Sequence, residues 1–357
     1  MDEALYGADG FYACGGGAGR HRDFITSPEV GPLFGAVLAR ALDTWWNELG
    51  CPSPFMVAEC GAGPGTLCRD ILRAEPHCGR ELRYILVDVA EPMRALHRTH
   101  RLPLVEATEL RGEAGFTAEG DYRVFAGQGP LVASVASLPG EGMHVVLANE
   151  LLDNLPFDIA QRADDHWSEV RVGLDASNAF GPVLIELDPL RSEALDAFAS
   201  GITAGATVPL QRAASSWIAS ARAALAAGRS RVVVIDYGAS LVELGTRAGA
   251  WMRTYRAHER GIDPFSNAGL CDITADVAID FVSRSQTVNF ISTQAEFLVE
   301  HGISDLVAEA RLVWSERAGI GDLAALAARS RVGEADALLD PNGLGAFIVT
   351  QWISRTK

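Results

Sequence analysis

Three glycines at every second position follow a short apolar stretch and one acidic residue in the first quarter of the chain. The segment reads Val57-Ala58-Glu59-Cys60-Gly61-Ala62-Gly63-Pro64-Gly65-Thr66-Leu67. Glycine is needed where a strand turns sharply into a helix and where a ligand lies against bare backbone. We therefore expect a small-molecule site here, between a strand that begins at Phe55 and a helix that begins at Thr66.

The spacing of the glycines separates two kinds of cofactor. A dinucleotide fold requires G-x-G-x-x-G, and Thr66 stands where that pattern has its last glycine, which disfavours a nicotinamide dehydrogenase. The pattern E-x-G-x-G-x-G better suits S-adenosyl-L-methionine (AdoMet), which has no pyrophosphate to place at a helix N-terminus. Asp88 ends the next apolar run, and its carboxylate can accept hydrogen bonds from both ribose hydroxyls.

Two further polar stretches follow apolar runs. Asn149-Glu150-Leu151-Leu152-Asp153-Asn154-Leu155-Pro156 ends a strand over 145–149, and Asp236-Tyr237-Gly238 ends a strand over 231–236. A doubly wound parallel sheet binds its ligand at the carboxyl ends of its strands. The four stretches together predict one site at that edge.

Glu150 and Asp153 are candidate catalytic residues. If the ligand is AdoMet, the reaction is methyl transfer, an in-line displacement in which the enzyme mainly aligns and desolvates the reactants. A guanidinium acceptor would need carboxylates to hold it, whereas a hydroxyl acceptor would need a base. The alternative is that both residues cap the next turn or helix. His258 is a candidate general base, although a single histidine is more often a surface or hydrogen-bonded residue. Tyr237 either lines the site or packs below it.

Alternating strands and helices must position these residues. We expect strands over 55–59, 82–88, 121–125, 145–149 and 231–236, and helices over 66–74 and 91–99. A glycine-rich, flexible or ligand-ordered arm over 1–23 precedes a helix that starts at Thr26 or Ser27 and runs to about Leu49. Thr26, Ser27, Pro28 and Glu29 either fold over the cofactor or only cap that helix.

The second half of the chain adds segments to this core. The runs 157–162 and 167–174 predict a β-hairpin, and 238–272 predicts a long loop or lid. Strands over 287–291 and 346–353, expected to pair antiparallel, flank helices over 293–300, 303–316 and 321–339. We divide the chain into a helical arm over 1–50 and a core over 51–357, with insertions at about 157–215 and a lid at about 238–285.

Composition excludes several classes of protein. Thirty basic and 46 acidic residues give a net charge of −16, which disfavours nucleic acid as a partner and would attract a cationic acceptor.

The six cysteines show no spacing typical of a metal site or a redox pair, so we expect no metal site and a reducing compartment. Neither a signal sequence nor a long apolar run is apparent, so we expect a cytoplasmic protein without a membrane partner. A homodimer is possible, but no interface can be identified from sequence.

The chain resembles the MidA-like family of AdoMet-dependent methyltransferases, which includes the mitochondrial complex I assembly methyltransferase. The resemblance rests on five segments: Asp23 to Val30 with Leu33-Phe34-Gly35, Glu59 to Leu67, Ala148 to Pro156, Ile235 to Gly238, and Arg253 to His258 followed by Asp272-Ile273-Thr274. Pro64 departs from the family, in which arginine is commoner, and removes a backbone donor from the loop.

The resemblance implies an α/β class I (Rossmann-like) methyltransferase with a seven-stranded doubly wound sheet, and it implies arginine methylation of a protein or peptide. Methylation of a small natural product and a non-catalytic assembly factor remain alternatives. With the positions above, it yields the following predicted AdoMet contacts: Thr26, Ser27, Pro28, Glu29, Glu59, Gly61, Gly63, Gly65, Thr66, Leu67, Asp88, Val89, Asn149, Glu150 and Leu151.

Overall fold

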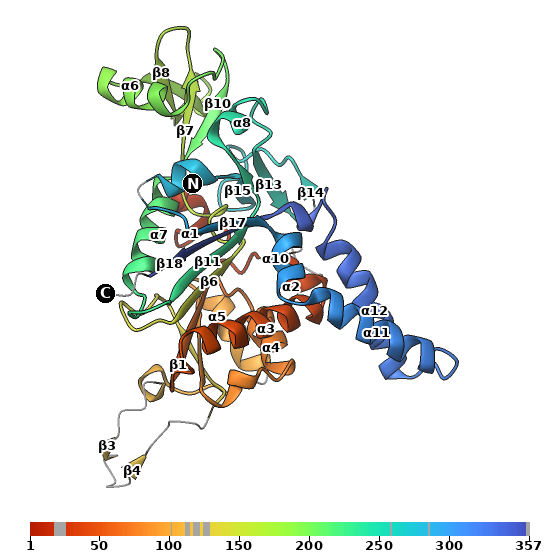
Figure 1. The fold of residues 1–357 in the computed structure, drawn as a ribbon. Helices are drawn as coiled ribbons and strands as arrows, with labels where there is room; N and C mark the ends of the chain where they lie inside the picture. The colour runs from red at the N-terminus through yellow and green to blue at the C-terminus, as the bar shows by residue number, and fades with distance from the viewer. Residues whose placement is uncertain are drawn as a thin grey trace. The chain divides into compact units, whose positions relative to one another are not determined.

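The computed structural model describes residues 1–17, 26–100, 102–110, 115–116, 122–123, 129–257, 259–284 and 286–354 (Figure 1). Internal contacts divide the chain into two units. Unit 1 comprises Met1–Phe24, Glu150–Ser220 and Asp236–Val288, and unit 2 comprises Ile25–Asn149, Ala221–Ile235 and Asn289–Lys357. Both units are therefore discontinuous in sequence, and none of the boundaries between them falls at residue 50.

Unit 2 is built on a seven-stranded sheet with the order β17-β18-β11-β6-β1-β2-β5. The strands are β1 (Phe55–Cys60), β2 (Leu82–Val87), β5 (Leu131–Val135), β6 (Val145–Asn149), β11 (Arg231–Asp236), β17 (Phe290–Thr293) and β18 (Ile348–Ile353). The five strands from β5 to β11 pair in parallel, and β17 pairs antiparallel with β18. The predicted α/β class I fold and the antiparallel closing pair are confirmed.

The third strand of this sheet is not where the sequence indicated. In place of 121–125, β5 pairs with β2, and the described part of the expected segment is the short strand β4 (Tyr122–Arg123), which pairs with β3 (Gly115–Phe116). Val132 and Ala133 of β5 are fully buried. The prediction was wrong because β5 is a short run containing Ser134, which gives little hydrophobic signal.

Helices of unit 2 pack on the sheet through one apolar core. They are α2 (Ser27–Val30), α3 (Pro32–Glu48), α4 (Thr66–Arg73), α5 (Glu91–His97), α10 (Gln294–Glu300), α11 (Ile303–Arg317) and α12 (Leu323–Leu338). Phe34 and Trp45 of α3 and Phe297 of α10 belong to this core. The single helix expected from Ser27 to Leu49 is two helices, because Pro32 disfavours helical backbone at Gly31 and then starts α3.

Unit 1 contains a four-stranded antiparallel sheet with the order β10-β7-β8-β9. The predicted hairpin is β7 (Asp158–Arg162) with β8 (Trp167–Leu174), and it is extended by β9 (Phe180–Glu186) and β10 (Thr207–Leu210). Helix α6 (Pro189–Phe198) follows β9. The remaining helices of this part of the chain are α7 (Arg212–Ala223), α8 (Leu241–Gly245) and α9 (Ile279–Ser283).

Residues 238–272 are not a long loop, so that prediction was wrong. They hold β12 (Gly238–Ala239), β13 (Met252–Arg256) and β14 (Glu259–Arg260), while β15 (Asp272–Ala275) and β16 (Val277–Ala278) follow directly. β13 pairs with both β14 and β15, and β12 pairs with β16. The apolar periodicity of the sequence does not reveal β15, because Asp272 and Thr274 are polar and yet as buried as their apolar neighbours.

The first 17 residues pack within unit 1, which overturns the expectation of a flexible or ligand-ordered arm for this segment. Helix α1 (Asp2–Tyr6) buries Leu5, and Phe11 lies with it in a small core that includes Cys271 and Ile273. Two aromatic contacts, Tyr6 on Tyr12 and Phe11 on Tyr12, add to this packing. The glycine content of the segment was a poor guide to its structure, because its few large apolar side chains pack in a core with residues distant in sequence.

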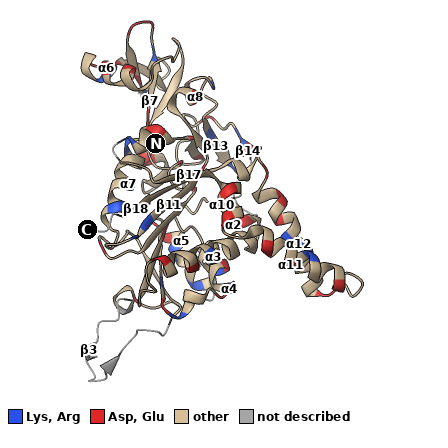
Figure 2. Cartoon of the chain, viewed as in Figure 1, with Lys and Arg blue, Asp and Glu red and all other residues tan. Residues whose placement is uncertain are grey.

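Charge is dispersed within each unit. Figure 2 shows Lys and Arg scattered over the helices and strands rather than gathered into one stripe. Short 3₁₀ helices complete the described structure at His77–Arg80, Arg98–His100, Ala107–Glu109 and Leu344–Ala346. Among the described helices, none is both long and apolar enough to cross a bilayer.

Candidate functional site

The glycine loop of unit 2 connects β1 to α4 as predicted. Gly61, Gly63 and Gly65 all have positive φ, at 70°, 52° and 84°, a region that L-residues disfavour. A Cβ added to Gly63 would meet no heavy atom within 4 Å, so open space lies in front of the loop there. A cradle of bare backbone with room before it is what the AdoMet amino-acid end requires, so these residues fit the cofactor.

Asp88 holds this loop in place. Its Oδ2 accepts a hydrogen bond of 2.8 Å from the N–H of Gly63, and its Oδ1 accepts one of 2.8 Å from the N–H of Ala90. Burial, the largest influence, raises the pKa of Asp88, while these two backbone donors lower it. Each carboxylate oxygen retains a second lone pair, so the predicted ribose contact is compatible with the observed bonds.

His97, which the sequence gave no reason to single out, supports the loop from inside unit 2. It is fully buried, with Nε2 2.8 Å from the carbonyl oxygen of Gly63 and Nδ1 2.8 Å from Oγ of Ser134. A carbonyl only accepts, so Nε2 carries the proton and Nδ1 accepts from the serine hydroxyl. The backbone N–H and the carbonyl oxygen of Gly63 are thus both hydrogen-bonded to side chains.

Glu59 is buried behind the loop. Its Oε2 accepts a hydrogen bond of 2.8 Å from the hydroxyl of Tyr84, and burial raises its pKa to about 8. Thr66 and Leu67, in the first turn of α4, are also buried. At the end of the neighbouring strand, in contrast, Val89 is 66% exposed and presents an apolar surface beside Asp88. Asn149 ends β6 on the same carboxyl edge of the sheet.

The segment from Thr26 to Glu29 adopts the predicted helix start. Thr26 is the N-cap of α2, but its side chain makes no capping hydrogen bond, and Pro28 lies in the first turn. Ser27 is fully buried, and its Oγ donates to Oε1 of Gln294 at 3.0 Å. The hydroxyl of Ser27 is therefore engaged inside unit 2, whereas Pro28 and Glu29 are half-buried.

In unit 1, the buried carboxylate of Asp236 organises the turn that begins at Glu150. Its Oδ2 accepts from the N–H groups of Leu152 and Asp153 at 2.9 and 3.3 Å, and its Oδ1 accepts from the N–H of Tyr237 at 3.0 Å. Burial first, and then the charges of Asp153 and Glu150, raise the pKa of Asp236. Asp236 is fully buried and acts here as a positioning residue.

Asp153 lies at the centre of a second set of hydrogen bonds. Its Oδ2 accepts from the hydroxyls of Tyr237 and Thr274, whereas its buried Oδ1 has no hydrogen-bond partner among the described residues. Burial is the main reason that its pKa is raised. Arg253 lies over the Tyr237 ring at 4.5 Å and forms an ion pair with Asp276.

Asp272 extends this cluster of carboxylates. Its Oδ1 accepts from the Tyr12 hydroxyl and from Nδ2 of Asn154, each at 3.0 Å. Burial, followed by the charge of Asp153, raises the pKa of Asp272 to about 7. Segments far apart in sequence, namely residues 12, 150–154, 236–237, 253 and 272–274, are thus joined in one hydrogen-bonded network within unit 1.

Glu150 differs from its buried neighbours because it is half-buried and has a positive φ of 52°. A non-glycine residue in this region costs roughly 1–2 kcal/mol and is often found at functional sites. Leu151, the next residue, is also half-buried. The third predicted catalytic residue, His258, lies outside the described residues.

The structure therefore brings some predicted residues together and adds others. The hydroxyl of Tyr237 donates a hydrogen bond to Asp153, and the N–H of Gly63 in the glycine loop donates one to Asp88. Thr274 and Asp272 could be identified as candidates only because they lie in a segment of the family resemblance. No sequence pattern pointed to His97 or Tyr12. Both of the latter act through long-range hydrogen bonds, which local spacing does not encode.

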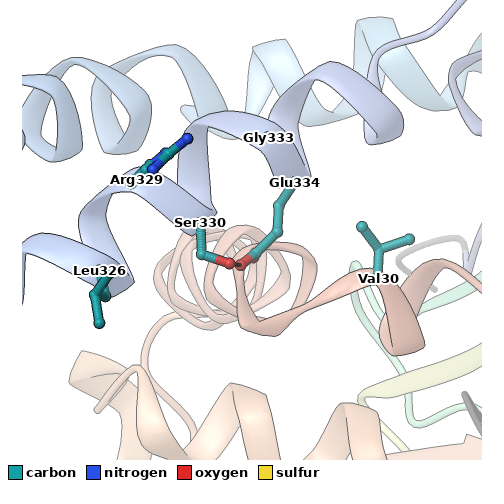
Figure 3. A pocket seen from close by; sticks show the side chains of 6 residues that line it. All are labelled: Val30, Leu326, Arg329, Ser330, Gly333 and Glu334. Carbon is teal, nitrogen blue, oxygen red and sulfur yellow. Dashed lines mark hydrogen bonds between the residues drawn. The ribbon is translucent and has the colours of Figure 1, made fainter. Parts of the chain in front are cut away.

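A cavity of about 430 Å³ lies elsewhere in unit 2, lined by Val30 and by Leu326, Arg329, Ser330, Gly333 and Glu334 of α12 (Figure 3). Figure 3 shows Ser330 and Glu334 pointing toward each other, and their side-chain oxygens are 2.9 Å apart. Oε2 of Glu334 also accepts from the N–H of Leu33. Glu334 is thus already bonded within the protein, and the cavity contains none of the predicted site residues.

No described group of three His, Cys, Asp or Glu side chains is arranged to hold a metal ion. All six cysteines are free thiols, and Cys60, Cys68, Cys78 and Cys271 are buried. Burial raises the pKa of Cys60 and Cys68, which disfavours their reactive thiolate forms.

Comparisons with known proteins agree with this geometry. Residues 37–294 match the model of a family of S-adenosyl-L-methionine-dependent methyltransferases, Methyltransf_28. The mitochondrial protein arginine methyltransferase NDUFAF7 of Xenopus tropicalis is 28% identical over 320 residues, covering 82% of this chain and 68% of the relative. The human protein of the same name is 28% identical over 284 residues, covering 78% of this chain and 62% of the relative.

A solved structure is similar to this chain over nearly its whole length. A COG1565 superfamily member from Burkholderia thailandensis, crystallised with S-adenosyl-homocysteine, superposes with a TM-score of 0.79 at 26% identity, covering 99% of this chain and 86% of that one. The cofactor of this chain is AdoMet, and the chain is an enzyme. It belongs to the Methyltransf_28 family of S-adenosyl-L-methionine-dependent methyltransferases.

Proposed function

We propose that this enzyme methylates a guanidinium nitrogen of arginine in a protein or peptide. The observation that carries the proposal is Glu150, a half-buried carboxylate with positive φ at the start of a turn that the buried carboxylate of Asp236 holds in place. Asp153, Asp236 and Asp272 are buried around this turn, and burial is the main reason that the pKa of each is raised. A cationic acceptor bound at Glu150 would place a positive charge beside this acidic cluster and offset part of the cost of burying its charges.

Glu150 is the residue that we assign to the acceptor. It follows Asn149, the last residue of β6, and it is accessible, unlike Asp153. When bound, AdoMet supplies an electrophilic methyl group on a sulfonium. Carboxylates that accept hydrogen bonds from a guanidinium concentrate electron density on the remaining nitrogen and orient it. We assign Asp153 and Asp236 to positioning of the turn, and the AdoMet contacts predicted from the sequence remain part of the proposal.

The relatives named protein arginine methyltransferase support this acceptor class. The net charge of −16 favours a cationic acceptor and disfavours nucleic acid. We keep a cytoplasmic location as a proposal, which the free cysteines support because they suit a reducing compartment. Family membership favours the enzyme over a non-catalytic assembly factor.

The test uses arginine-containing candidate proteins incubated with isotopically labelled AdoMet. Mass spectrometry should find label on arginine, and Glu150→Gln should reduce kcat about tenfold or more while changing the affinity for S-adenosylhomocysteine much less. Glu193→Gln, at an exposed position on α6, is the matched control and should retain kcat. Label found only on a small metabolite would favour the natural-product alternative. A Glu150→Gln variant with normal kcat and lower thermal stability would favour a capping role.

A further inference from the structure

One face of the paired strands β8 and β9 in unit 1 carries a continuous row of exposed apolar side chains. Residues directly opposite each other on paired strands share a face, and alternate residues along a strand point to opposite faces. Leu174 pairs with Phe180, Val172 with Pro182 and Val170 with Leu184. These side chains form what we call the β8–β9 apolar face: Val170, Val172, Leu174, Phe180, Pro182 and Leu184.

Most of this face is open to solvent. Val172 is 63% exposed, and Leu174, Phe180 and Leu184 are each between 56% and 57% exposed. The opposite face of the same strands is covered where Trp167 packs, since its N–H group donates to Oγ of Ser192 and its Nε1 donates to Asp196 of α6.

The opposite face also carries charge, since Glu169 and Arg171 form an ion pair there. None of the six residues of the β8–β9 apolar face is charged, although the next pair on the same side, Ser168 and Glu186, adds one exposed carboxylate at its end. A partner with a strongly charged surface would therefore find no complement on it. An uncharged apolar surface can instead pack against the same surface of a second copy, which is what a twofold interface requires.

Hydrogen bonds fix the turn of the hairpin that presents the face. At its turn, Oδ1 of Asp175 accepts from the N–H of Ser177, the hydroxyl of Ser177 and the N–H of Ala179. Such preorganisation lowers the entropy lost on association. Addition of a strand at the free edge of β9 is disfavoured because Pro182, at the middle of the strand, has no N–H to donate.

The size of the face also suits a dimer. The four most exposed side chains present on the order of 400 Å² of apolar surface, within the range in which such patches are often functional. Two copies would bury about 800 Å² of apolar area, which at roughly 65% apolar content corresponds to a total near 1,200 Å², the lower limit for a specific interface.

We propose that two copies of this chain associate face to face through the β8–β9 apolar face, on a twofold axis. The proposal does not depend on the identity of the methyl acceptor. Sedimentation velocity over a micromolar concentration series tests it. The wild-type protein should shift from its monomer mass of 38.0 kDa to twice that value.

Two substitutions on the face, Val172→Glu and Leu184→Glu, should each raise the dimer dissociation constant about a hundredfold or more, because the axis buries the new charge twice. Ile185→Glu is the matched control, since Ile185 lies on the same strand with similar exposure, 49%, but on the opposite face. It should leave the dimer intact. Circular dichroism and S-adenosylhomocysteine binding should be unchanged in all three variants.

The proposal would be overturned by a wild-type protein that stays monomeric throughout, by a dimer that survives both substitutions on the face, or by an equal loss of dimer in Ile185→Glu. A dimer abolished only by Leu323→Glu, at the 85% exposed leucine of α12, would place the interface elsewhere and would also overturn it.

Discussion

Replacing Gly63 with alanine separates the ligand-binding role of the glycine loop from its role in folding. The φ of Gly63 is 52°, and the space that a Cβ would enter is empty within 4 Å. An L-residue in this conformation costs roughly 1–2 kcal/mol, and about 0.4–1 kcal/mol of that is offset because alanine restricts the unfolded chain. The free energy of unfolding should therefore fall by only about 1 kcal/mol.

AdoMet binding should respond much more strongly, because the new methyl group occupies the space that we assign to the ligand. We expect the dissociation constant of S-adenosylhomocysteine, measured by calorimetry, to rise about tenfold or more, or about 1.4 kcal/mol. Gly50→Ala is the matched control: its φ is 78° and the space at its Cβ is equally empty, but it lies in the turn after α3. Wild-type affinity in Gly63→Ala would refute the assignment of the loop.

Two further predictions concern buried acids. The folded-state pKa of Glu59 is raised from 4.5 to about 8, so between these values the folded protein binds more protons than the unfolded chain and loses stability as pH rises. The melting temperature of Glu59→Gln should therefore fall less over this pH range than that of the wild type, and equal slopes would contradict the buried-acid interpretation. Tyr237→Phe and Thr274→Val each remove one donor to Asp153 and should each lower the free energy of unfolding by about 1–2 kcal/mol in urea denaturation. Their effects should not be additive, since the double variant leaves that oxygen without either donor; agreement with the sum within about 0.5 kcal/mol would argue against a shared acceptor.

Features with a local cause could be predicted from the sequence. The loop at Gly61, Gly63 and Gly65 follows from the backbone conformations that only glycine adopts readily, and β1, β2, β6 and β11 follow from continuous apolar runs. The position of Asp88 at the end of β2 is a consequence of the same pattern. Such patterns depend only on residues close together in the chain, so they can be recognised without knowledge of tertiary contacts.

Tertiary structure alone decided how the polar residues are used. Asp153 was predicted as catalytic from its position, but it is buried among hydroxyl donors, which leaves Glu150 as the accessible carboxylate of the pair. Tyr12 and His97 meet their partners across long sequence separations, and residues 238–272 form strands because their polar side chains are satisfied by such partners. A buried polar group is stable only when distant residues supply its hydrogen bonds, and no local pattern in the sequence records where those residues will lie.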